Sequence, residues 1–447
     1  MIKLYNTMTR QLEPFKTQVE GIVRMYVCGP TVYNYIHIGN GRAAASFDTI
    51  RRYLLYRGYE VTYVSNFTDV DDKIIRRARE VGVTPHELAA TYITAYQEDA
   101  KALNILPASY HPKVTDYIPQ IIRFIEDLIA KKVAYVSQGD VYFRVSTSKN
   151  YGKLAHKNVE DLLAGASGRL DEDRNRKENP LDFALWKSVK SDDESWSSPW
   201  GQGRPGWHIE CSVMAGDLLG DTLDIHAGGA DLEFPHHTNE IAQSEAKTGK
   251  TFANYWLHNG FVTVNNEKMS KSLGNFMTVH EALQTVDGMV LRFFLSSQHY
   301  RRPLQFTADS LEEAKTTVMY LKNTYHSLFN GQVDMARLIQ FEHEFQAAMD
   351  EDFNAANGLT VLFEMARWIN SGHYDQAGKD LFARLLSIFG LVFEEEILDK
   401  EIEDLIEQRQ KARQQKDFVK ADAIRDSLAK KGIRLLDTKD GVRWQRD

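Results

Sequence analysis

The segment His37-Ile38-Gly39-Asn40 contains residue types that suit the binding of a phosphate. Glycine lets the backbone approach a ligand closely. A helix predicted over residues 42–57 would direct its unpaired N–H groups and partial positive charge at the same ligand. His37 can add a hydrogen bond to charge that develops on the phosphate during reaction. On these four residues alone, a glycine turn beside a structural histidine explains the pattern equally well.

A second polar segment, residues 268–272, has the sequence KMSKS. Lys268 and Lys271 offer mobile point charges, and the two serines offer hydroxyl donors. This composition favours a loop that grips a polyphosphate. A solvated surface loop is the weaker explanation.

The chain has two cysteines, Cys28 and Cys211, and both lie among histidines, glycines and aromatic residues. Two thiols cannot form a disulfide framework for 447 residues, which favours a reducing cytoplasm. His236 and Glu240 are four residues apart in a helical pattern, so both project from one face. Spacing does not choose between His236 and His237, and it does not bring Cys28 to Cys211. Read alone, two buried inert thiols are the more frequent arrangement.

The elements that must position these residues alternate as strand, loop and helix. Residues 22–28 and 59–65 are expected to be strands on either side of the helix over 42–57, which predicts a parallel βαβ unit with a right-handed crossover. Strand, glycine turn and helix return over residues 222–249. The intervening sequence therefore interrupts one sheet.

That intervening sequence, residues 112–206, is less regular. Two polar stretches within it, residues 165–180 and 190–206, are rich in glycine or proline, and we expect both to be loops. Residues 261–276 are predicted to form a short strand followed by a basic loop.

The C-terminal third has a different pattern. Apolar residues recur at helical spacing from 308 to 393, which predicts a helical bundle. Residues 408–446 then carry twelve Lys or Arg against five Asp, although the net charge of the chain is −8. Basic residues together with Phe418 and Trp444 suit an unpaired RNA loop. For most individual lysines there, a solvated charged helix is the more frequent explanation.

No apolar run approaches the roughly 20 residues that span a bilayer, and the first residues lack the apolar core of a secretory signal. We therefore expect a cytoplasmic protein that does not bind a membrane.

The two polar segments together resemble the paired signatures of class I aminoacyl-tRNA synthetases. Longer blocks resemble cysteinyl-tRNA synthetases nearly from end to end: MYVCGPTVYNYIHIGNGR, NFTDVDDKII, GRPGWHIECS, DIHAGGADLEFPHHTNEIAQSE, EKMSKSLGNF and KDFVKADAIRDSLAKKGIRLLDTKDGVRW.

The resemblance implies an α/β fold. It comprises a Rossmann-like parallel-sheet catalytic domain with an inserted connective subdomain, an α-helical bundle and a small C-terminal anticodon-binding domain. The expected spans are 1–111 and 207–262 for the two halves of the catalytic domain, 112–206 for the insertion, 263–307 for the KMSKS loop and stem-contact region, 308–398 for the tRNA-binding bundle and 399–447 for the C-terminal domain.

The resemblance also implies that Cys28, Cys211, His236 and Glu240 bind one Zn²⁺ per subunit, because all four positions match the family's zinc ligands. Cysteine and serine differ by one atom, and a shape-based pocket separates such substrates poorly. Zinc separates them by ligand softness, so no editing domain is needed. The alternative is a coordinatively closed zinc that only stabilises the fold.

Further site residues follow from the same resemblance. Trp207 is expected to form a wall beside the cysteine side chain, with Gly29, Thr31, Thr68 and His226 around its amino and carboxylate groups. ATP is expected to contact Gly39, Gly228, Gly229 and Asp231, with the acidic residue on the ribose. His37 and Asn40 would steady the α-phosphate, and Lys268 and Lys271 would hold the β- and γ-phosphates with Mg²⁺. Base rates favour a core aromatic for Trp207, a helix N-cap for Thr68 and a core histidine for His226.

Asn40 stands where the class pattern has histidine. Asparagine can donate to a phosphate but cannot titrate, which argues against a general-acid role at this position and leaves an electrostatic role. The implied function is the activation of L-cysteine with ATP and its transfer to the terminal adenosine of tRNA(Cys), at the 2′-hydroxyl, by a monomer.

Two other functions compete with this interpretation. A cysteine ligase with an amino-sugar acceptor, as in mycothiol synthesis, would share the first step but would not need the basic segment after Gln408. A non-catalytic RNA-binding paralogue should have damaged phosphate signatures, whereas KMSKS is intact.

Overall fold

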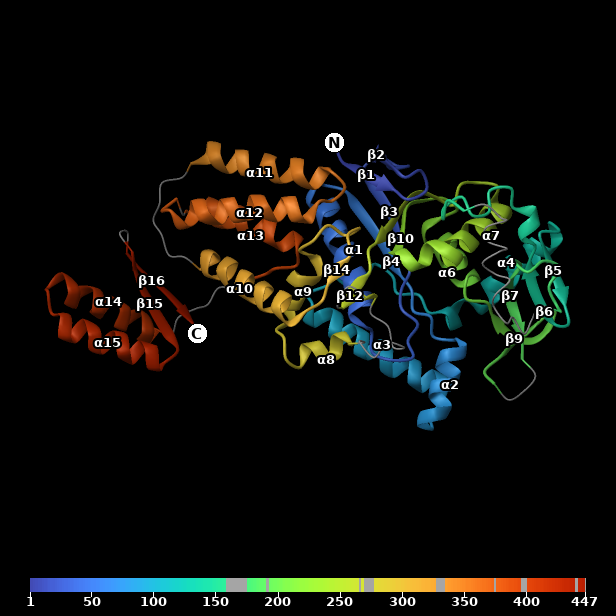
Figure 1. The fold of residues 1–447 in the computed structure, drawn as a ribbon, viewed down its shortest axis with the longest axis horizontal. Helices are drawn as coiled ribbons and strands as arrows, with labels where there is room; N and C mark the ends of the chain where they lie inside the picture. Colours follow the sequence, from blue (N-terminus) through green and yellow to red (C-terminus); the bar gives the residue numbers. More distant parts are fainter. Residues whose placement is uncertain are drawn as a thin grey trace.

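The computed structural model describes residues 1–157, 175–189, 193–264, 267–268, 277–326, 334–373, 375–394, 400–438 and 441–446, with backbone alone at 267–268, 400–401, 403 and 436–446. Figure 1 shows a parallel sheet at the centre, an inserted β-rich region at one end, and a helical bundle and a small C-terminal unit toward the other. No helix in the described ranges combines the length and hydropathy that a membrane crossing requires.

The central sheet has four parallel strands in the order β11-β10-β3-β4. The strands are β3 (Ile22–Val27), β4 (Glu60–Ser65), β10 (Leu223–Gly229) and β11 (Ala253–Asn259). From β3 the chain crosses outward to β4, and from β10 it crosses outward to β11 on the opposite side. A crevice therefore opens between β3 and β10 at the carboxyl edge, where ligands bind in such sheets. The predicted parallel sheet is confirmed.

Helix α1 (Ile38–Tyr56) begins four residues before the predicted start at residue 42, and the predicted boundary is wrong. His37 is its N-cap, and the Asn40 N–H donates to His37 Nδ1 at 3.2 Å. An imidazole cap lies outside the usual Ser, Thr, Asp and Asn signals, which explains the error. Because of this earlier start, Gly39 lies in the first turn, between the Ile38 N–H, which donates to the Met277 carbonyl, and the Asn40 N–H, which donates to His37.

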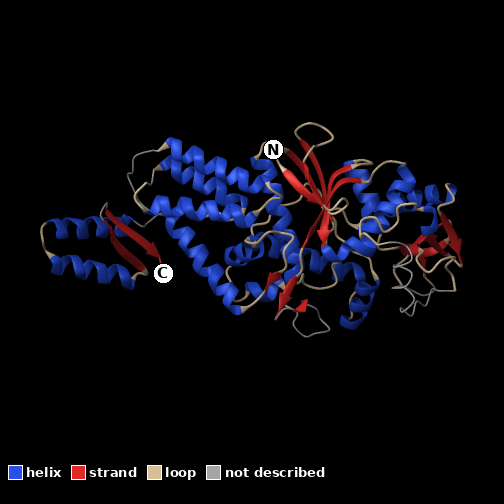
Figure 2. Cartoon of the chain, turned by 45° about the horizontal axis from the view of Figure 1, so that its top comes forward, coloured by secondary structure: helices blue, strands red, loops and turns tan. Residues whose placement is uncertain are grey.

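Helices cover both faces of the sheet (Figure 2). Helix α1 packs on β4, β10 and β11, and α6 (Ile209–Leu219) packs on β3 and β4. Helix α7 (Thr238–Thr248) lies beside α6. The sheet is thus doubly wound, with α1 on one face and α6 and α7 on the other.

The inserted region contains an antiparallel sheet in the order β5-β6-β7-β9-β8. Its elements are α4 (Ile118–Ala130), β5 (Ala134–Ser137), β6 (Asp140–Phe143), β7 (Phe183–Ser188), β8 (Trp196–Ser198) and β9 (Gly201–Pro205). The prediction of a loop over 190–206 is wrong, because β8 and β9 pair there. Gly201, with a φ of +113°, supplies the turn. Residues 165–174 and 190–192 lie outside the described residues.

The predicted helical bundle is present and is anchored to α1. Its helices are α10 (Ala308–Tyr325), α11 (Met335–Asp350), α12 (Ala355–Asn370) and α13 (Gln376–Ile388). Arg292, fully buried on α9 (Gly288–Ser296), connects the bundle to α1. Its guanidinium lies 2.7 Å from the Asp48 carboxylate of α1 and donates at 2.9 Å to the Phe389 carbonyl after α13.

The C-terminal unit consists of two helices and a hairpin. Its elements are α14 (Lys400–Gln414), α15 (Phe418–Lys430), β15 (Ile433–Thr438) and β16 (Gly441–Arg446). Phe418 is exposed, whereas the side chain of Trp444 lies outside the described residues.

Candidate active site and metal cluster

A cavity of about 380 Å³ occupies the crevice at the carboxyl edge of the sheet. Its walls come from the loop after β3, the start of α1, the loop after β10 and the residues after β11. The residues predicted from the sequence that line it are Cys28, Gly29, Thr31, His37, Gly39, Asn40, Trp207, Gly229 and Asp231. Segments distant in the sequence therefore meet around one hollow of a size suited to a nucleotide and a small substrate.

Close backbone packing shapes the floor of this cavity. The Gly29 N–H donates to Asn66 Oδ1 at 2.9 Å. A Cβ on Gly29 would lie 1.7 Å from the Asn66 carbonyl oxygen, so only glycine fits. A Cβ on Gly229 would lie 2.5 Å from Asp231 Oδ1, because that carboxylate folds back over the strand end.

Trp207 is not a core aromatic, since 41% of it is exposed. Its ring centroid lies 4.4 Å from that of His236, at the boundary between the cavity and the groups beneath it. Trp207 therefore lies in the cavity wall, beside His236 of the buried cluster.

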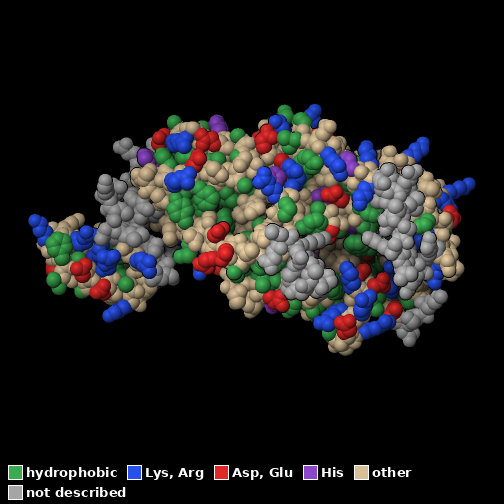
Figure 3. All heavy atoms as spheres, in the orientation of Figure 1, with side chains coloured by type: hydrophobic (Ala, Val, Ile, Leu, Met, Phe, Trp, Pro, Cys, Tyr) green, Lys and Arg blue, Asp and Glu red, His purple; other side chains and the backbone are tan. Residues whose placement is uncertain are grey.

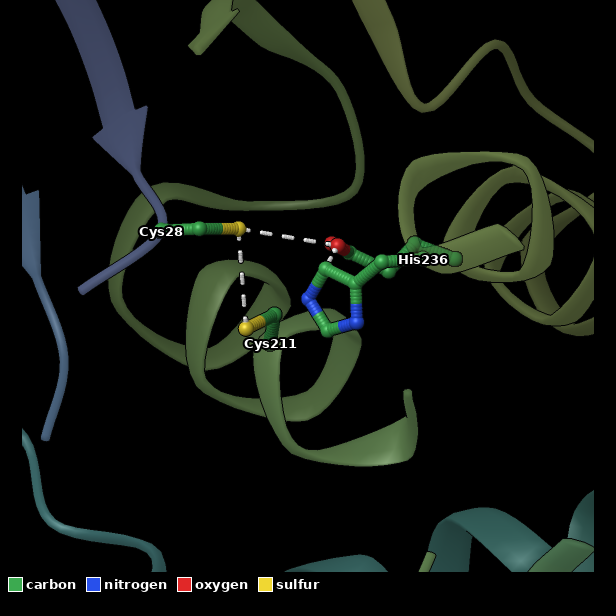
Figure 4. A group of neighbouring side chains, drawn as sticks. Cys28, Cys211 and His236 are labelled. Atoms are coloured by element: carbon green, nitrogen blue, oxygen red, sulfur yellow. Dashed lines mark hydrogen bonds and ion pairs between the residues drawn. The ribbon is translucent and has the colours of Figure 1, made fainter. Parts of the chain in front are cut away.

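Beneath this wall, two thiols, an imidazole and a carboxylate converge (Figure 4). Cys28 Sγ lies 3.8 Å from Cys211 Sγ and 3.6 Å from Glu240 Oε1. His236 Nε2 lies 3.0 Å from the same Glu240 oxygen. The four ligand atoms all lie within 4.8 Å of one another, and a sulfur–sulfur distance of 3.8 Å leaves both cysteines as free thiols.

A second set of side chains shares two members with the first. Cys28, His226, His237 and Glu240 also place one ligand atom each within 4.8 Å of the others. His237 Nε2 lies 3.3 Å from Cys28 Sγ but 4.0 Å from Glu240 Oε1. The geometry thus keeps open the choice between His236 and His237.

The cluster perturbs the protonation of its members. Burial opposes the charged form of His236, but Glu240 and Cys211 outweigh it and raise its pKa to about 10. A hydrogen bond from Cys28 lowers the pKa of Cys211 to about 6. Burial and the adjacent Cys211 raise the pKa of Cys28. The site therefore favours one thiolate, and a bound cation would favour the second.

Outer partners orient the two histidines. His236 Nδ1 lies 3.0 Å from His208 Nδ1, which directs His236 Nε2 toward Glu240. His237 Nδ1 lies 2.8 Å from His258 Nε2. Such partners fix the tautomer of a ligating imidazole. Sequence reasoning missed His208 and His258, and no spacing signal marks them.

Some predicted residues lie away from the cavity surface. Thr68 is buried, does not cap α2 (Asp72–Val81), whose N-cap is Asp71, and donates to Glu210 Oε2 at 2.8 Å. His226 is fully buried, with Nε2 3.3 Å from Glu240 Oε2. Gly228 packs against Leu232 and His237, and a Cβ there would lie 2.8 Å from Leu232.

Only the backbone of Lys268 is described, in the short strand β13 (Glu267–Lys268). Lys271 lies outside the described residues. The predicted phosphate contacts of both lysines therefore remain predictions.

Solved structures share the architecture of this chain. Mycobacterium tuberculosis methionyl-tRNA synthetase in complex with methionyl-adenylate aligns with a TM-score of 0.59 at 15% identity, covering 82% of this chain and 88% of that one. An Agrobacterium radiobacter K84 LeuRS–tRNA–LeuAMS ternary complex aligns with a TM-score of 0.60 at 11% identity, covering 84% of each chain. The crevice and its sheet thus have the fold of a class I aminoacyl-tRNA synthetase.

Sequence comparisons give the family within that class. The model described as the catalytic domain of tRNA synthetases class I (C) matches residues 14–316, a DALR domain matches 344–394, and a cysteinyl-tRNA ligase anticodon binding domain matches 396–444. Cysteine–tRNA ligases of Streptococcus pneumoniae serotype 4 and Streptococcus mutans serotype c are 66% and 64% identical over 447 residues, covering all of each chain. The chain belongs to the cysteinyl-tRNA synthetase family, as the sequence predicted.

Proposed function

We propose that the protein activates L-cysteine with ATP to cysteinyl-adenylate and transfers the cysteinyl group to the 3′-terminal adenosine of tRNA(Cys). The observation that carries this proposal is the cluster of Cys28, Cys211, His236 and Glu240 directly beneath the cavity that adjoins the start of α1. The cavity beside α1 suits a nucleotide phosphate, and the adjoining cluster suits a metal that selects a thiol.

The residues fit zinc. Two thiols, an imidazole and a carboxylate are ligands that zinc accepts, and all but the half-buried Cys28 are buried. Glu240 is fully buried, with Oε1 3.0 Å from His236 Nε2 and 3.6 Å from Cys28 Sγ, so its carboxylate faces the same point as two other members of the set. When bound, zinc accepts the substrate thiolate as a further ligand in preference to a hydroxyl.

Cys211 and His236 support the first ligand set over the second. The first set offers two thiols, whereas the second offers one. His236 Nε2 also lies closer to Glu240 Oε1 than His237 Nε2 does, at 3.0 Å against 4.0 Å. We assign the ligands to Cys28, Cys211, His236 and Glu240 on these grounds.

The chain's own residues position the reactants for the first step. His37 Nδ1 accepts the Asn40 N–H, so Nε2 of the neutral ring carries the proton and can donate to the α-phosphate. The first turn of α1 adds the positive end of its helix dipole. Attack by the cysteine carboxylate expels pyrophosphate, with Lys268, Lys271 and Mg²⁺ on the β- and γ-phosphates. Most of the catalysis is positioning and charge stabilisation.

In the second step, the terminal ribose hydroxyl of tRNA attacks the adenylate carbonyl and releases AMP. The bundle and the C-terminal unit, with its exposed Phe418, would contact the rest of the tRNA. We expect a cytoplasmic protein, because this reaction serves translation, and we propose that it acts as a monomer.

Purified protein should aminoacylate transcribed tRNA(Cys) and catalyse pyrophosphate exchange with cysteine but not with serine. Normal cysteine-dependent exchange without tRNA aminoacylation would instead favour an amino-sugar acceptor. No exchange with any amino acid would contradict the proposed activity altogether.

Chelation of zinc should abolish the stabilisation of the protein against thermal unfolding by L-cysteine. A ligand at about 100 times its Kd stabilises the folded state by roughly 2.7 kcal/mol. L-Cysteine at that excess should therefore raise the midpoint of thermal unfolding of zinc-loaded protein, while the chelated protein should show no shift. Serine is the matched control and should shift neither form. A cysteine-induced shift that survives chelation would contradict the assigned ligand set.

Asp231→Ala should weaken ATP binding and leave cysteine binding intact. The Asp231 carboxylate lines the cavity and folds over Gly229, where a ribose hydroxyl can donate to it. A hydrogen bond to a charged group contributes about 1.5–3 kcal/mol, so KM for ATP should rise roughly 10- to 100-fold. Pyrophosphate exchange at varied ATP measures this change. An unchanged KM for ATP, or an equal rise in KM for cysteine, would remove Asp231 from the ribose site.

A further inference from the structure

A second hollow of about 330 Å³, which we name the α2 groove, adjoins the active-site cavity. It is lined by Tyr33, Asn34, Lys73, Arg76, Arg77 and Glu80. Tyr33, Asn34 and Lys73 line both hollows, so the groove continues from the wall of the active site. A ligand chain that leaves the active site on this side must pass over α2.

The acidic side chains at the N-terminus of α2 have other partners. Asp71 caps the helix by accepting the Lys73 N–H at 2.8 Å. Asp72 pairs with Lys187 at 3.2 Å and with Arg204, both in the inserted region. Among the described residues, neither acid forms an ion pair with a cation of the groove.

Two cations of the groove are available to a ligand. Glu80 pairs with Arg77 at 3.0 Å, so the carboxylate offsets that one cation. Lys73 and Arg76 form no ion pair within the part of the chain that the structure describes, and both are exposed. Figure 3 shows Lys and Arg side chains gathered over α2, at the lower right of the view. The groove is thus locally basic in a chain whose net charge is −8.

An aromatic ring completes the groove. Lys73 Nζ lies 5.6 Å from the centroid of the Tyr33 ring. Aromatic rings beside cations form the surfaces on which proteins hold single-stranded nucleic acids, with bases stacked and phosphates paired. Inorganic phosphate or a triphosphate alone would not use such a ring.

We propose that the α2 groove binds the backbone phosphates of the unpaired 3′ end of the tRNA, just before the terminal adenosine enters the active site. This inference rests on the proposed function. During transfer, the active-site cavity must hold the adenylate and the terminal ribose together, so the preceding nucleotides must lie outside it. The α2 groove shares a wall with the cavity and has the charge that these nucleotides require.

The test is Arg76→Gln, with Arg79→Gln as the matched control. Arg79 lies on the same helix but pairs with Asp193 and does not line the groove. Arg76→Gln should raise the Kd for uncharged tRNA(Cys) about 5- to 10-fold at moderate salt. It should also reduce the slope of log K against log salt by about 0.7, the value for one single-strand phosphate contact. Arg79→Gln should change neither quantity, and Arg76→Lys should preserve the slope.

The same variants should be measured with tRNA(Cys) that lacks its last three nucleotides. Wild type and Arg76→Gln should bind this truncated tRNA equally, since the proposed contact is gone. An equal loss with full and truncated tRNA would place Arg76 against another part of the tRNA and overturn the proposal.

Pyrophosphate exchange shows whether tRNA or ATP occupies the groove. Arg76→Gln should leave KM for ATP within twofold of wild type. A rise in KM for ATP without a change in tRNA affinity would assign the groove to the nucleotide and overturn the proposal. Failure of the wild-type protein to charge tRNA would instead contradict the proposed function. This outcome differs from those that contradict the proposal for the α2 groove.

Discussion

Cys211→Ser is expected to abolish stoichiometric zinc binding and to reduce kcat/KM for cysteine activation by more than about 100-fold. Loss of a residue that only orients a metal ligand already costs up to about 100-fold, so loss of a ligand itself should cost more. Serine places a hard hydroxyl where a thiolate stood, and zinc prefers the softer ligand. The sulfur of Cys211 is buried and lies 3.8 Å from that of Cys28, as two ligands of one ion require. Elemental analysis and pyrophosphate exchange measure the two effects.

His237→Gln is the matched control for this experiment. His237 adjoins His236 in the sequence and belongs only to the second ligand set, whereas Cys211 belongs only to the first. The assigned set therefore predicts zinc loss in Cys211→Ser and zinc retention in His237→Gln. Zinc retention in Cys211→Ser with zinc loss in His237→Gln would instead assign the metal to Cys28, His226, His237 and Glu240. Full zinc content in both variants would show that neither set holds it.

His37→Asn is expected to lower kcat for adenylate formation by about 10²- to 10³-fold, the usual effect of removing one donor to a transition-state charge. Asparagine is a good N-cap, so it retains the hydrogen bond from the Asn40 N–H at the start of α1. It cannot also make the hydrogen bond to the phosphate that we propose for the Nε2–H of the imidazole. KM for ATP and for cysteine should change little, because the lost interaction forms mainly in the transition state.

His37→Ala separates capping from catalysis. It removes both hydrogen bonds, so it should share the loss in kcat and also lower the free energy of unfolding by about 1 kcal/mol. Single-turnover adenylate formation and thermal unfolding of both variants give the comparison. A His37→Asn enzyme with kcat within a few-fold of wild type would assign His37 a capping role alone.

Local sequence patterns predicted the strands and the parallel sheet because these depend on short-range periodicity. Apolar runs that end at Cys28 and Ser65 mark two neighbouring strands, and a helix between them requires a parallel pairing. The start of α1 was mispredicted because an imidazole cap carries no general signal. The hairpin of β8 and β9 was missed because its few residues are polar and rich in glycine.

The cluster depends on contacts that no local pattern encodes. Cys28 and Cys211 are 183 positions apart, and their approach requires β3 and α6 to pack against each other. Spacing left His236 and His237 equivalent, and both prove to face Cys28 or Glu240. The outer partners His208 and His258 come from a turn and from β11, so only the folded chain brings them to the cluster. The family resemblance named the four ligands, and the structure places their side chains together.

X-ray absorption at the zinc edge, with and without substrate, tests the central assignment most directly. The assigned ligand set predicts two sulfur ligands, from Cys28 and Cys211, in the substrate-free protein. Addition of L-cysteine should raise the number of sulfur ligands by one, and addition of L-serine should leave it unchanged. A zinc-loaded protein whose sulfur coordination stays the same on adding cysteine would contradict selection of the substrate by its thiol.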